Sequence, residues 1–404
     1  MMRSAGHGGD FGRFTLPYCS FVVPGESRRR VGVGVDTDVL DLTTVASIVV
    51  PEHAELFAHG SLDALLAAGF ETWHDVRTAL TDWLGDEAHT RVVDHHLAPA
   101  DQVELVLPFT VGDYVDFYAS EHHATNLGRM FRPDGDALLP NWKHLPVGYH
   151  GRSGTVVVSG TPVRRPSGQR RSSTDEVVFG PSVRLDIEAE VGFVVGTGSR
   201  LGDPVALADA DRHVFGVCLV NDWSARDLQA WEYVPLGPFL GKSFATSVSP
   251  WVVPMEALER ARTHPPERDV PLLPYLDDDG ARPWALDLRL EVRLGSVNGE
   301  EVVSQPPFAG LYWTAAQMLA HMTVNGATVR PGDLFASGTV SGPELDQRGS
   351  FIELSWNGVE PLTLADGSTR SFLENGDTVT ISATAPGPDG EDLWLGEVTG
   401  TITP

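Results

Sequence analysis

The sequence is poor in the residues that build cross-linked or membrane-bound proteins. It holds only two cysteines, Cys19 and Cys218, in 404 residues. Two thiols cannot form a disulfide framework or a thiolate metal site, so we expect both to be inert in a reducing compartment. The N-terminal residues lack a continuous apolar segment, and the strongest apolar stretch, 308–320, is interrupted by polar residues. We therefore expect a soluble, cytoplasmic protein without a membrane partner.

Positive charge is scarce too. The chain has 55 acidic residues and 29 basic ones, which gives a net charge of −26 at pH 7. Because a field of that sign repels polyphosphates, we expect no nucleic-acid partner. Only Lys143 and Lys242 among the basic residues are lysines, and the other 27 are arginines. A lysine in such a chain either marks a place that needs a compact ammonium group or remains by chance, and both readings stay open.

The length predicts two domains, because 404 residues exceed what one hydrophobic core usually organises. A turn-rich passage at 97–109 is the predicted boundary between residues 1–107 and 108–404. In the first part, the apolar stripe from Trp73 to Leu84, stopped by Gly85, predicts an amphipathic helix. The second part is dominated by strand patterns and Gly/Pro turns, so we expect a β-rich α+β fold.

Two segments of the second part alternate between apolar and polar residues. Residues 183–194 and 286–294 both follow this period of two and predict half-buried strands. Residues Phe308–Met322 predict a buried helix, and Phe351–Trp356 another strand. The polar face of 286–294 alternates in sign, as a solvated face does, whereas the polar face of 183–194 carries three successive acidic residues.

Those acidic residues are the first indication of a metal site. In an extended strand, the α-carbons of Glu188 and Glu190 are roughly 6.6 to 6.8 Å apart and their side chains share one face, so both carboxylates can reach one cation. An all-oxygen ligand set suits magnesium, calcium or manganese better than zinc or copper. An exposed acidic strand explains the same pattern without a metal.

A second polar set follows the apolar run 214–220. If the segment is helical, the spacing of Asp222, Arg226, Gln229 and Tyr233 puts the four on one face. A solvent-facing stripe with an ordinary ion pair is the alternative.

A third set lies in the segment DYVDFYASEHHATNLGRMF. Asp116, Tyr118 and His123 could face a common cavity there, with the histidine as a base near neutral pH. The adjacent His122 leaves open which of the two imidazoles has that role.

Taken together, these segments resemble the fumarylacetoacetate hydrolase family. The resemblance extends from Asp113 to about Trp356 and runs through six blocks in order: DYVDFYASEHHATNLGRMFRP, LPNWKHLPVGYHGRSGTVVVSGTPVRRPSGQ, LDIEAEVGFVVG, NDWSARDLQAWEYVPLGPFLGKSFATSVSPWVVP, RPGDLFASGTVSGPE and GSFIELSW. Six long blocks are far more specific than a short motif. The resemblance implies a small N-terminal SH3-like barrel and a larger C-terminal mixed β-sandwich roll.

The resemblance also implies roles for individual residues. The implied metal ligands are Asp116, Glu188, Glu190 and Asp222, with Lys242 and Thr246 at an associated magnesium site. The implied substrate-binding residues are Tyr118, Arg132, Tyr149, Gln229, Tyr233 and Thr339. His123 matches the catalytic base and Glu353 its orienting carboxylate, while Arg226, Gln229 and Lys242 are expected to stabilise the oxyanion. Lys143 lies in a matching block without an implied role.

The function that follows is hydrolysis of a carbon–carbon bond in a β-diketo acid. Members of the family convert 4-fumarylacetoacetate to fumarate and acetoacetate in tyrosine and phenylalanine catabolism, so we expect this small-molecule substrate, a Mg²⁺ or Ca²⁺ cofactor (with Mn²⁺ also suitable) and a homodimer. One alternative is an acylpyruvate hydrolase or oxaloacetate decarboxylase of the same superfamily, but such relatives generally lack the N-terminal barrel. Another is a non-catalytic protein that binds a divalent ion, which would need no base.

Overall fold

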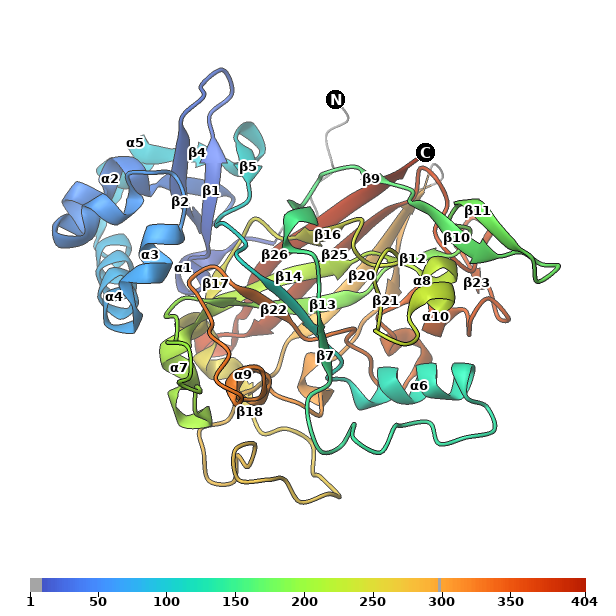
Figure 1. Ribbon diagram of the computed structural model, residues 1–404. Helices are drawn as coiled ribbons and strands as arrows, with labels where there is room; N and C mark the ends of the chain where they lie inside the picture. Colours follow the sequence, from blue (N-terminus) through green and yellow to red (C-terminus); the bar gives the residue numbers. More distant parts are fainter. Residues whose placement is uncertain (1–8, 297–298) are drawn as a thin grey trace.

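A computed structural model describes residues 9–296 and 299–404 (Figure 1). Its strands form three large sheets and several two-stranded ones, with helices on their faces and edges. The mixed, β-rich α+β class expected from the sequence is thereby confirmed. The SH3-like barrel, the sandwich roll and the division at residue 107 stay predictions.

The N-terminal part, at the left of Figure 1, is an antiparallel five-stranded sheet with the order β4-β3-β2-β1-β5. Its strands are β1 (Tyr18–Val22), β2 (Arg29–Val35), β3 (Asp38–Asp41), β4 (Leu97–Pro99) and β5 (Glu104–Val106). Its helices are α1 (Gly12–Thr15), α2 (Leu42–Val49), α3 (Asp63–Ala68), α4 (Phe70–Gly85) and α5 (Thr90–His96). The predicted amphipathic helix is α4, which buries Trp73, Val76, Leu80 and Trp83 and ends at Gly85.

The central sheet has eight strands, seven in the order β7-β6-β22-β13-β14-β16-β8, while β17 pairs separately with β14. These strands are β6 (Tyr114–Phe117), β7 (Gly148–His150), β8 (Val156–Val158), β13 (Ala189–Val195), β14 (Val214–Asp222), β16 (Thr246–Val248), β17 (Val253–Pro254) and β22 (Leu334–Ala336). Strands β13 and β14 are buried along their whole lengths. Their side chains enter two hydrophobic clusters, one on each face of the sheet: Val191 lies in the first and Val194 in the second.

The second C-terminal sheet has the order β21-β20-β25-β26-β9. Its strands are β9 (Val163–Arg164), β20 (Arg289–Ser296), β21 (Gly299–Ser304), β25 (Thr378–Pro386) and β26 (Asp392–Thr403). The predicted alternation of 286–294 is confirmed, because Leu288, Leu290, Val292 and Leu294 are buried and Arg289 is exposed. Those residues join Val191 and Val217 of the central sheet in one core.

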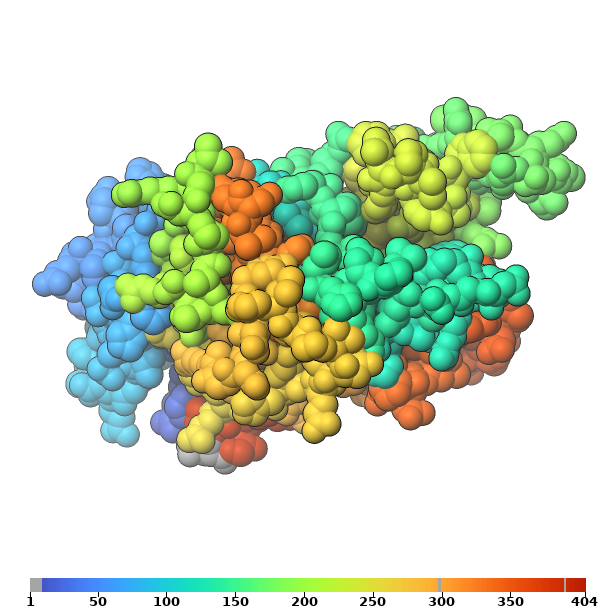
Figure 2. All heavy atoms as spheres, turned by 60° about the horizontal axis from the view of Figure 1, so that its bottom comes forward, coloured from blue at the N-terminus to red at the C-terminus, as the bar shows by residue number. Residues whose placement is uncertain are grey.

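Shorter elements complete the chain. The two-stranded sheets are β10 (Ser167–Arg171) with β11 (Val177–Pro181), β12 (Leu185–Asp186) with β15 (Ser224–Ala225), β18 (Arg262–Thr263) with β19 (Ala285–Leu286), and β23 (Leu362–Thr363) with β24 (Thr369–Arg370). The helices are α6 (Glu121–Phe131), α7 (Ala210–His213), α8 (Arg226–Glu232), α9 (Ala315–Thr323) and α10 (Phe351–Leu354). The 3₁₀ helices are η1 (Pro51–Phe57), η2 (Glu87–His89), η3 (Ala100–Gln102), η4 (Ser153–Thr155), η5 (Leu207–Asp209), η6 (Met255–Ala261), η7 (Phe308–Gly310), η8 (Leu345–Gln347) and η9 (Pro388–Gly390). Figure 2 shows α8 beside the β10–β11 hairpin, at the end of the molecule away from the N-terminal part.

Several local predictions need correction. Residues 183–194 do not form one half-buried strand. The strand pairing is interrupted between β12, which ends at Asp186, and β13, which begins at Ala189, and both faces of β13 are covered. Asp222 ends strand β14, and the helix that was expected to carry it begins only at Arg226. The helix predicted over 308–322 begins at Ala315, where Thr314 and Gln317 form a capping box.

The segment predicted as a strand at 351–356 begins instead with the short helix α10. Its first two N–H groups, those of Phe351 and Ile352, donate to the buried carboxylate of Asp186 at 2.7 and 3.1 Å. A carboxylate at a helix N-terminus satisfies free donors and interacts favourably with the helix dipole. That partner is 165 residues away in the chain, so the local apolar pattern gave no sign of it.

Among the described residues, no helix is long and apolar enough to cross a membrane. Both cysteines are free and buried, and burial raises the pKa of the Cys218 thiol to about 12. The pKa of the Cys19 thiol is raised as well, by burial above all. Since the thiolate is the reactive form, we expect both side chains to be unreactive in the folded protein.

Both thiols of the native protein are therefore expected to stay unmodified by a disulfide reagent such as DTNB at pH 8. In a denaturant the same reagent should titrate two thiols per chain, because unfolding exposes them and restores their ordinary pKa. Rapid reaction of either thiol in the native protein would contradict the buried positions.

Candidate active site

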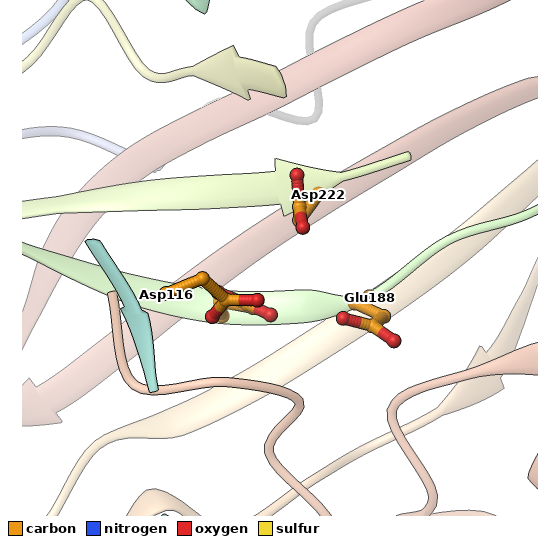
Figure 3. A group of neighbouring side chains, drawn as sticks. Asp116, Glu188 and Asp222 are labelled. Carbon is orange, nitrogen blue, oxygen red and sulfur yellow. The ribbon is translucent and has the colours of Figure 1, made fainter. Parts of the chain in front are cut away.

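Four carboxylates converge where strands of the central sheet end. Asp116 lies on β6, Glu190 on β13, Asp222 at the end of β14, and Glu188 just before β13. Strand pairing brings them together although they are distant in sequence, since β6 pairs with β22, β22 with β13, and β13 with β14. One oxygen from each carboxylate lies within 4.8 Å of the others, and all four side chains are buried. Figure 3 shows Asp116, Glu188 and Asp222 around one common space.

Two cations partly neutralise this cluster. The ammonium group of Lys242 donates to Glu188 at 2.5 Å and to Asp222 at 2.8 Å. The guanidinium group of Arg226 reaches Glu188 through Nη1 at 2.7 Å and Asp186 through Nε at 2.8 Å. The rare Lys242 thus lies inside the acidic cluster, where its ammonium group pairs with two carboxylates. Lys143, by contrast, pairs at the surface with Glu121 and Asp269.

The remaining oxygens fit a divalent cation. Within the described chain, both carboxylate oxygens of Glu190 and Oδ1 of Asp116 are buried without a hydrogen-bond partner. Buried carboxylate oxygens without a partner are costly unless a metal ion or proton compensates them. Because the set contains only oxygen ligands, the cluster suits a hard ion such as Mg²⁺ or Ca²⁺.

The electrostatics divide the four carboxylates into two groups. Burial and the neighbouring carboxylates raise the pKa of Glu190 and of Asp116 well above the usual range, and burial also raises that of Asp222. Glu188 behaves differently, because Lys242 and Arg226 outweigh its burial and lower its pKa. Glu190 and Asp116, which also have the oxygens without partners, would therefore gain most from a bound cation.

A pocket of about 330 Å³ opens beside Asp222. The hydroxyl of Tyr149 donates to Asp222 Oδ2 at 3.2 Å, and Thr246 Oγ1 donates to its Oδ1 at 2.6 Å. Tyr149, Lys242 and Thr246 also line the pocket, so a small molecule there reaches the edge of the carboxylate cluster.

An imidazole–carboxylate pair lies next to the cluster. Nδ1 of His123, in helix α6, is 2.6 Å from Glu353 Oε2 in α10, and both side chains are almost fully buried. Asn126 donates to the other carboxylate oxygen, and the hydroxyls of Ser341 and Ser350 donate to Oε2. Although burial opposes ionisation, His123, Asn126 and Ser350 lower the pKa of Glu353 to about 2. A carboxylate fixed in this way holds the imidazole in one orientation and tautomer, with Nε2 free to accept a proton.

Comparison with known proteins assigns the chain to a family. The model described as "Fumarylacetoacetase N-terminal" matches residues 15–108, and the one described as "Fumarylacetoacetate (FAA) hydrolase C-terminal" matches residues 114–403. The chain belongs to the fumarylacetoacetate hydrolase family. It is an enzyme, a hydrolase of that family.

Individual family members are similar over nearly the whole chain. Human fumarylacetoacetase is 44% identical over 98% of this chain and 96% of its own, and Arabidopsis thaliana fumarylacetoacetase is 43% identical over 96% and 94%. A solved structure described as a fumarylacetoacetate hydrolase from Exiguobacterium antarcticum covers 96% of this chain and 99% of its own with a TM-score of 0.56. At 20% identity, that likeness concerns the fold alone.

The family resemblance implies further site residues, and their contacts in the structure differ. The ring of Tyr118 meets that of His123 edge-on, with centroids 5.3 Å apart. Thr339 is buried and its hydroxyl has no partner among the described residues, whereas the amide oxygen of Gln229 accepts from Arg226 at 3.3 Å. Arg132 donates to the backbone of its own loop at Ala137.

The structure does not bring every candidate into this group. Tyr233 is 46% exposed at the end of α8, and no hydrogen bond joins it to the cluster within the described chain. His122 is half-buried and, as far as the structure describes the chain, has no carboxylate partner like that of His123. The geometry thus favours His123 over His122 for the base.

Reasoning from the sequence missed the residues that support the site. Asp186 is fully buried and binds Arg226, and Asn126, Ser341 and Ser350 all donate to Glu353. The only signal for Asp186 was its position two residues before Glu188, on the same face of the predicted strand. The hydroxyl and amide donors carried no signal, because single polar residues are common everywhere in a chain.

Replacing Glu190 by Gln should stabilise the ion-free protein and weaken the stabilisation by Mg²⁺ or Ca²⁺. Glu190 has a folded-state pKa above its ordinary value of 4.5, so its contribution to stability is greatest below that pH and is lost as the pH rises. The melting temperature of the ion-free wild type should therefore fall more steeply than that of Glu190→Gln between about pH 5 and about pH 8. A cation at 100 times its dissociation constant should restore about 2.7 kcal/mol to the wild type.

Scanning calorimetry with and without EDTA measures these differences. Glu55→Gln, at an exposed position, is the matched control and should behave as the wild type does. Equal cation-induced shifts in the wild type and in Glu190→Gln would exclude Glu190 as a ligand.

Proposed function

We propose that the protein is a divalent-metal-dependent fumarylacetoacetase, which hydrolyses 4-fumarylacetoacetate to fumarate and acetoacetate. The observation that carries the proposal is the His123–Glu353 pair beside four buried carboxylates. Tyr118, two residues after Asp116, packs its ring against that of His123, which supports a single reaction centre formed by the base and the ion site. A protein that only stores an ion needs no oriented imidazole, which argues against that alternative.

The bond to be broken joins two carbon atoms, and its cleavage leaves negative charge on the departing acetoacetate. The ion, when held by Asp116, Glu188, Glu190 and Asp222, supplies the positive charge that stabilises this group. His123 accepts a proton at Nε2 from water, whose oxygen bonds to the carbonyl carbon beside the fumaryl group. The carbon–carbon bond then breaks, its electron pair leaves with acetoacetate, and the proton from His123 is passed to that carbon.

Fixed donors stabilise the oxyanion formed when water adds. Nη2 of Arg226 is buried and has no partner in the described chain, so it is available to the substrate. Gln229 and Lys242 lie beside it as further donors, at hydrogen-bond distance from Arg226 and from Glu188 respectively. The proposed substrate contacts are Tyr118, Arg132, Tyr149, Gln229, Tyr233 and Thr339. Lys242 and Thr246 are proposed to lie next to the ion.

The proposal also includes the wider setting that the family implies. We infer a cytoplasmic homodimer with an N-terminal SH3-like barrel over residues 1–107 and a C-terminal sandwich roll over 108–404, acting in tyrosine and phenylalanine catabolism. Mg²⁺ or Ca²⁺ is the proposed ion, with Mn²⁺ as a suitable substitute. Sedimentation velocity on the purified protein tests the dimer directly.

His123→Gln should lower kcat by a factor of about 10² to 10⁴, the usual contribution of a general base, and leave the binding of Mg²⁺ or Ca²⁺ unchanged. Steady-state kinetics and calorimetric titration measure the two effects. His122→Gln is the control, and its kcat should stay within about threefold of the wild type. Near-normal turnover in His123→Gln together with a large loss in His122→Gln would move the base to His122.

The substrate is tested by following fumarylacetoacetate loss spectrophotometrically, alongside acylpyruvates and oxaloacetate. We expect kcat/KM for fumarylacetoacetate to exceed the others, loss of activity with EDTA, and recovery when Mg²⁺ or Ca²⁺ is added. Faster cleavage of an acylpyruvate would assign the chain to that activity, and full activity in EDTA would contradict the role of the ion.

A further inference from the structure

Asp186 makes contacts to three separate parts of the site although it binds neither substrate nor ion in the proposed mechanism. It is the last residue of β12, and its side chain is fully buried. Oδ1 accepts from the backbone N–H groups of Ile187 at 2.8 Å and Phe351 at 2.7 Å. Oδ2 accepts from Arg226 Nε at 2.8 Å and from the N–H of Ile352 at 3.1 Å.

Each residue that Asp186 contacts is, or adjoins, a different candidate group of the site. Arg226, held by Asp186 through Nε, pairs with Glu188 through Nη1, and its Nη2 is buried without a partner among the described residues. Phe351 and Ile352 begin helix α10, whose third residue is Glu353, the partner of His123. The remaining contact, Ile187, immediately precedes Glu188. One carboxylate therefore touches the supports of the oxyanion donor, the base and the ion cluster.

We propose that Asp186 is a positioning residue that fixes Arg226 and the Glu353–His123 pair in one common frame. This inference rests on the proposed function, because it assigns Arg226 and His123 to the same reaction. Precise placement of such groups is worth large factors in rate, since a displacement of about 1 Å costs on the order of 10². A buried carboxylate with four donors is well suited to hold them, because charge-assisted hydrogen bonds are short and strong.

Asp186→Asn tests the inference with almost no change in volume. Each carboxylate oxygen of Asp186 faces two N–H donors, so an amide NH₂ in either orientation would oppose donors with a donor. We expect kcat to fall at least about 10²-fold, the effect of losing one oxyanion donor, while KM stays within about threefold. Asp186→Ser, which presents no NH₂ group, serves where Asp186→Asn does not fold.

Asp41→Asn is the matched control. Asp41 also caps a helix, α2, and also pairs with an arginine, Arg30 at 2.6 Å, but it lies in the N-terminal sheet. If Asp186 contributed to stability alone, both substitutions would lower the melting temperature and neither would change kcat per folded molecule. We expect kcat of Asp41→Asn to stay within about twofold of the wild type.

A second readout does not depend on the reaction. The proton between His123 Nδ1 and Glu353 lies in a hydrogen bond of 2.6 Å, so it should give a low-field proton NMR signal that is absent in His123→Gln. This signal should shift or disappear in Asp186→Asn and persist in Asp41→Asn. An unchanged signal with kcat within threefold of the wild type in the folded Asp186 variants would overturn the inference. The signal could be present in the wild type and absent in Asp186→Asn while the wild type does not cleave fumarylacetoacetate. That result would refute the proposed function and leave the positioning role of Asp186 intact.

Discussion

The structure depends on an excess of buried negative charge at one end of the central sheet. Four carboxylates face one another there, and within the described part of the chain only Lys242 and Arg226 form ion pairs with them. Such a cluster is expensive to bury, because like charges at short range raise each other's pKa and desolvation adds to the cost. The cluster needs compensation, and a divalent cation would supply charge and coordination together. The four carboxylates thus lower the stability of the ion-free protein, in addition to any part they take in a reaction.

The sheet makes this arrangement possible because its buried strands end at the same place. Pairing of β6, β22, β13 and β14 fixes the carboxylate positions to the backbone register, and hydrophobic packing on both sheet faces holds the register. Helices outside the sheet carry the other candidate groups: α6 carries His123, α10 carries Glu353 and α8 begins with Arg226. Groups on rigid elements keep their geometry better than groups on loops.

The sequence predicted the parts of this arrangement that local patterns encode. The sequence predicts helix α4 and strand β20, because the buried side chains of both elements follow the periodicity of their apolar residues. The spacing of Glu188 and Glu190 predicts that the two share one face of a strand. The same alternation also fits a solvated face, because no local pattern indicates whether a second layer of structure covers a strand. The resemblance to a family, and not spacing, joined Asp116 and Asp222 to them.

The remaining differences have one physical cause, which is contact between distant segments. Helix α10 looked like a strand because its stabilising partner, Asp186, lies far away in the sequence. The central claim is that Asp116, Glu188, Glu190 and Asp222 hold one divalent ion. Anomalous diffraction from crystals grown with Mn²⁺ tests it most directly: the account predicts one peak among the four carboxylates, at coordination distance from Glu190 and Asp116. A peak elsewhere, or none at saturating Mn²⁺, would contradict it.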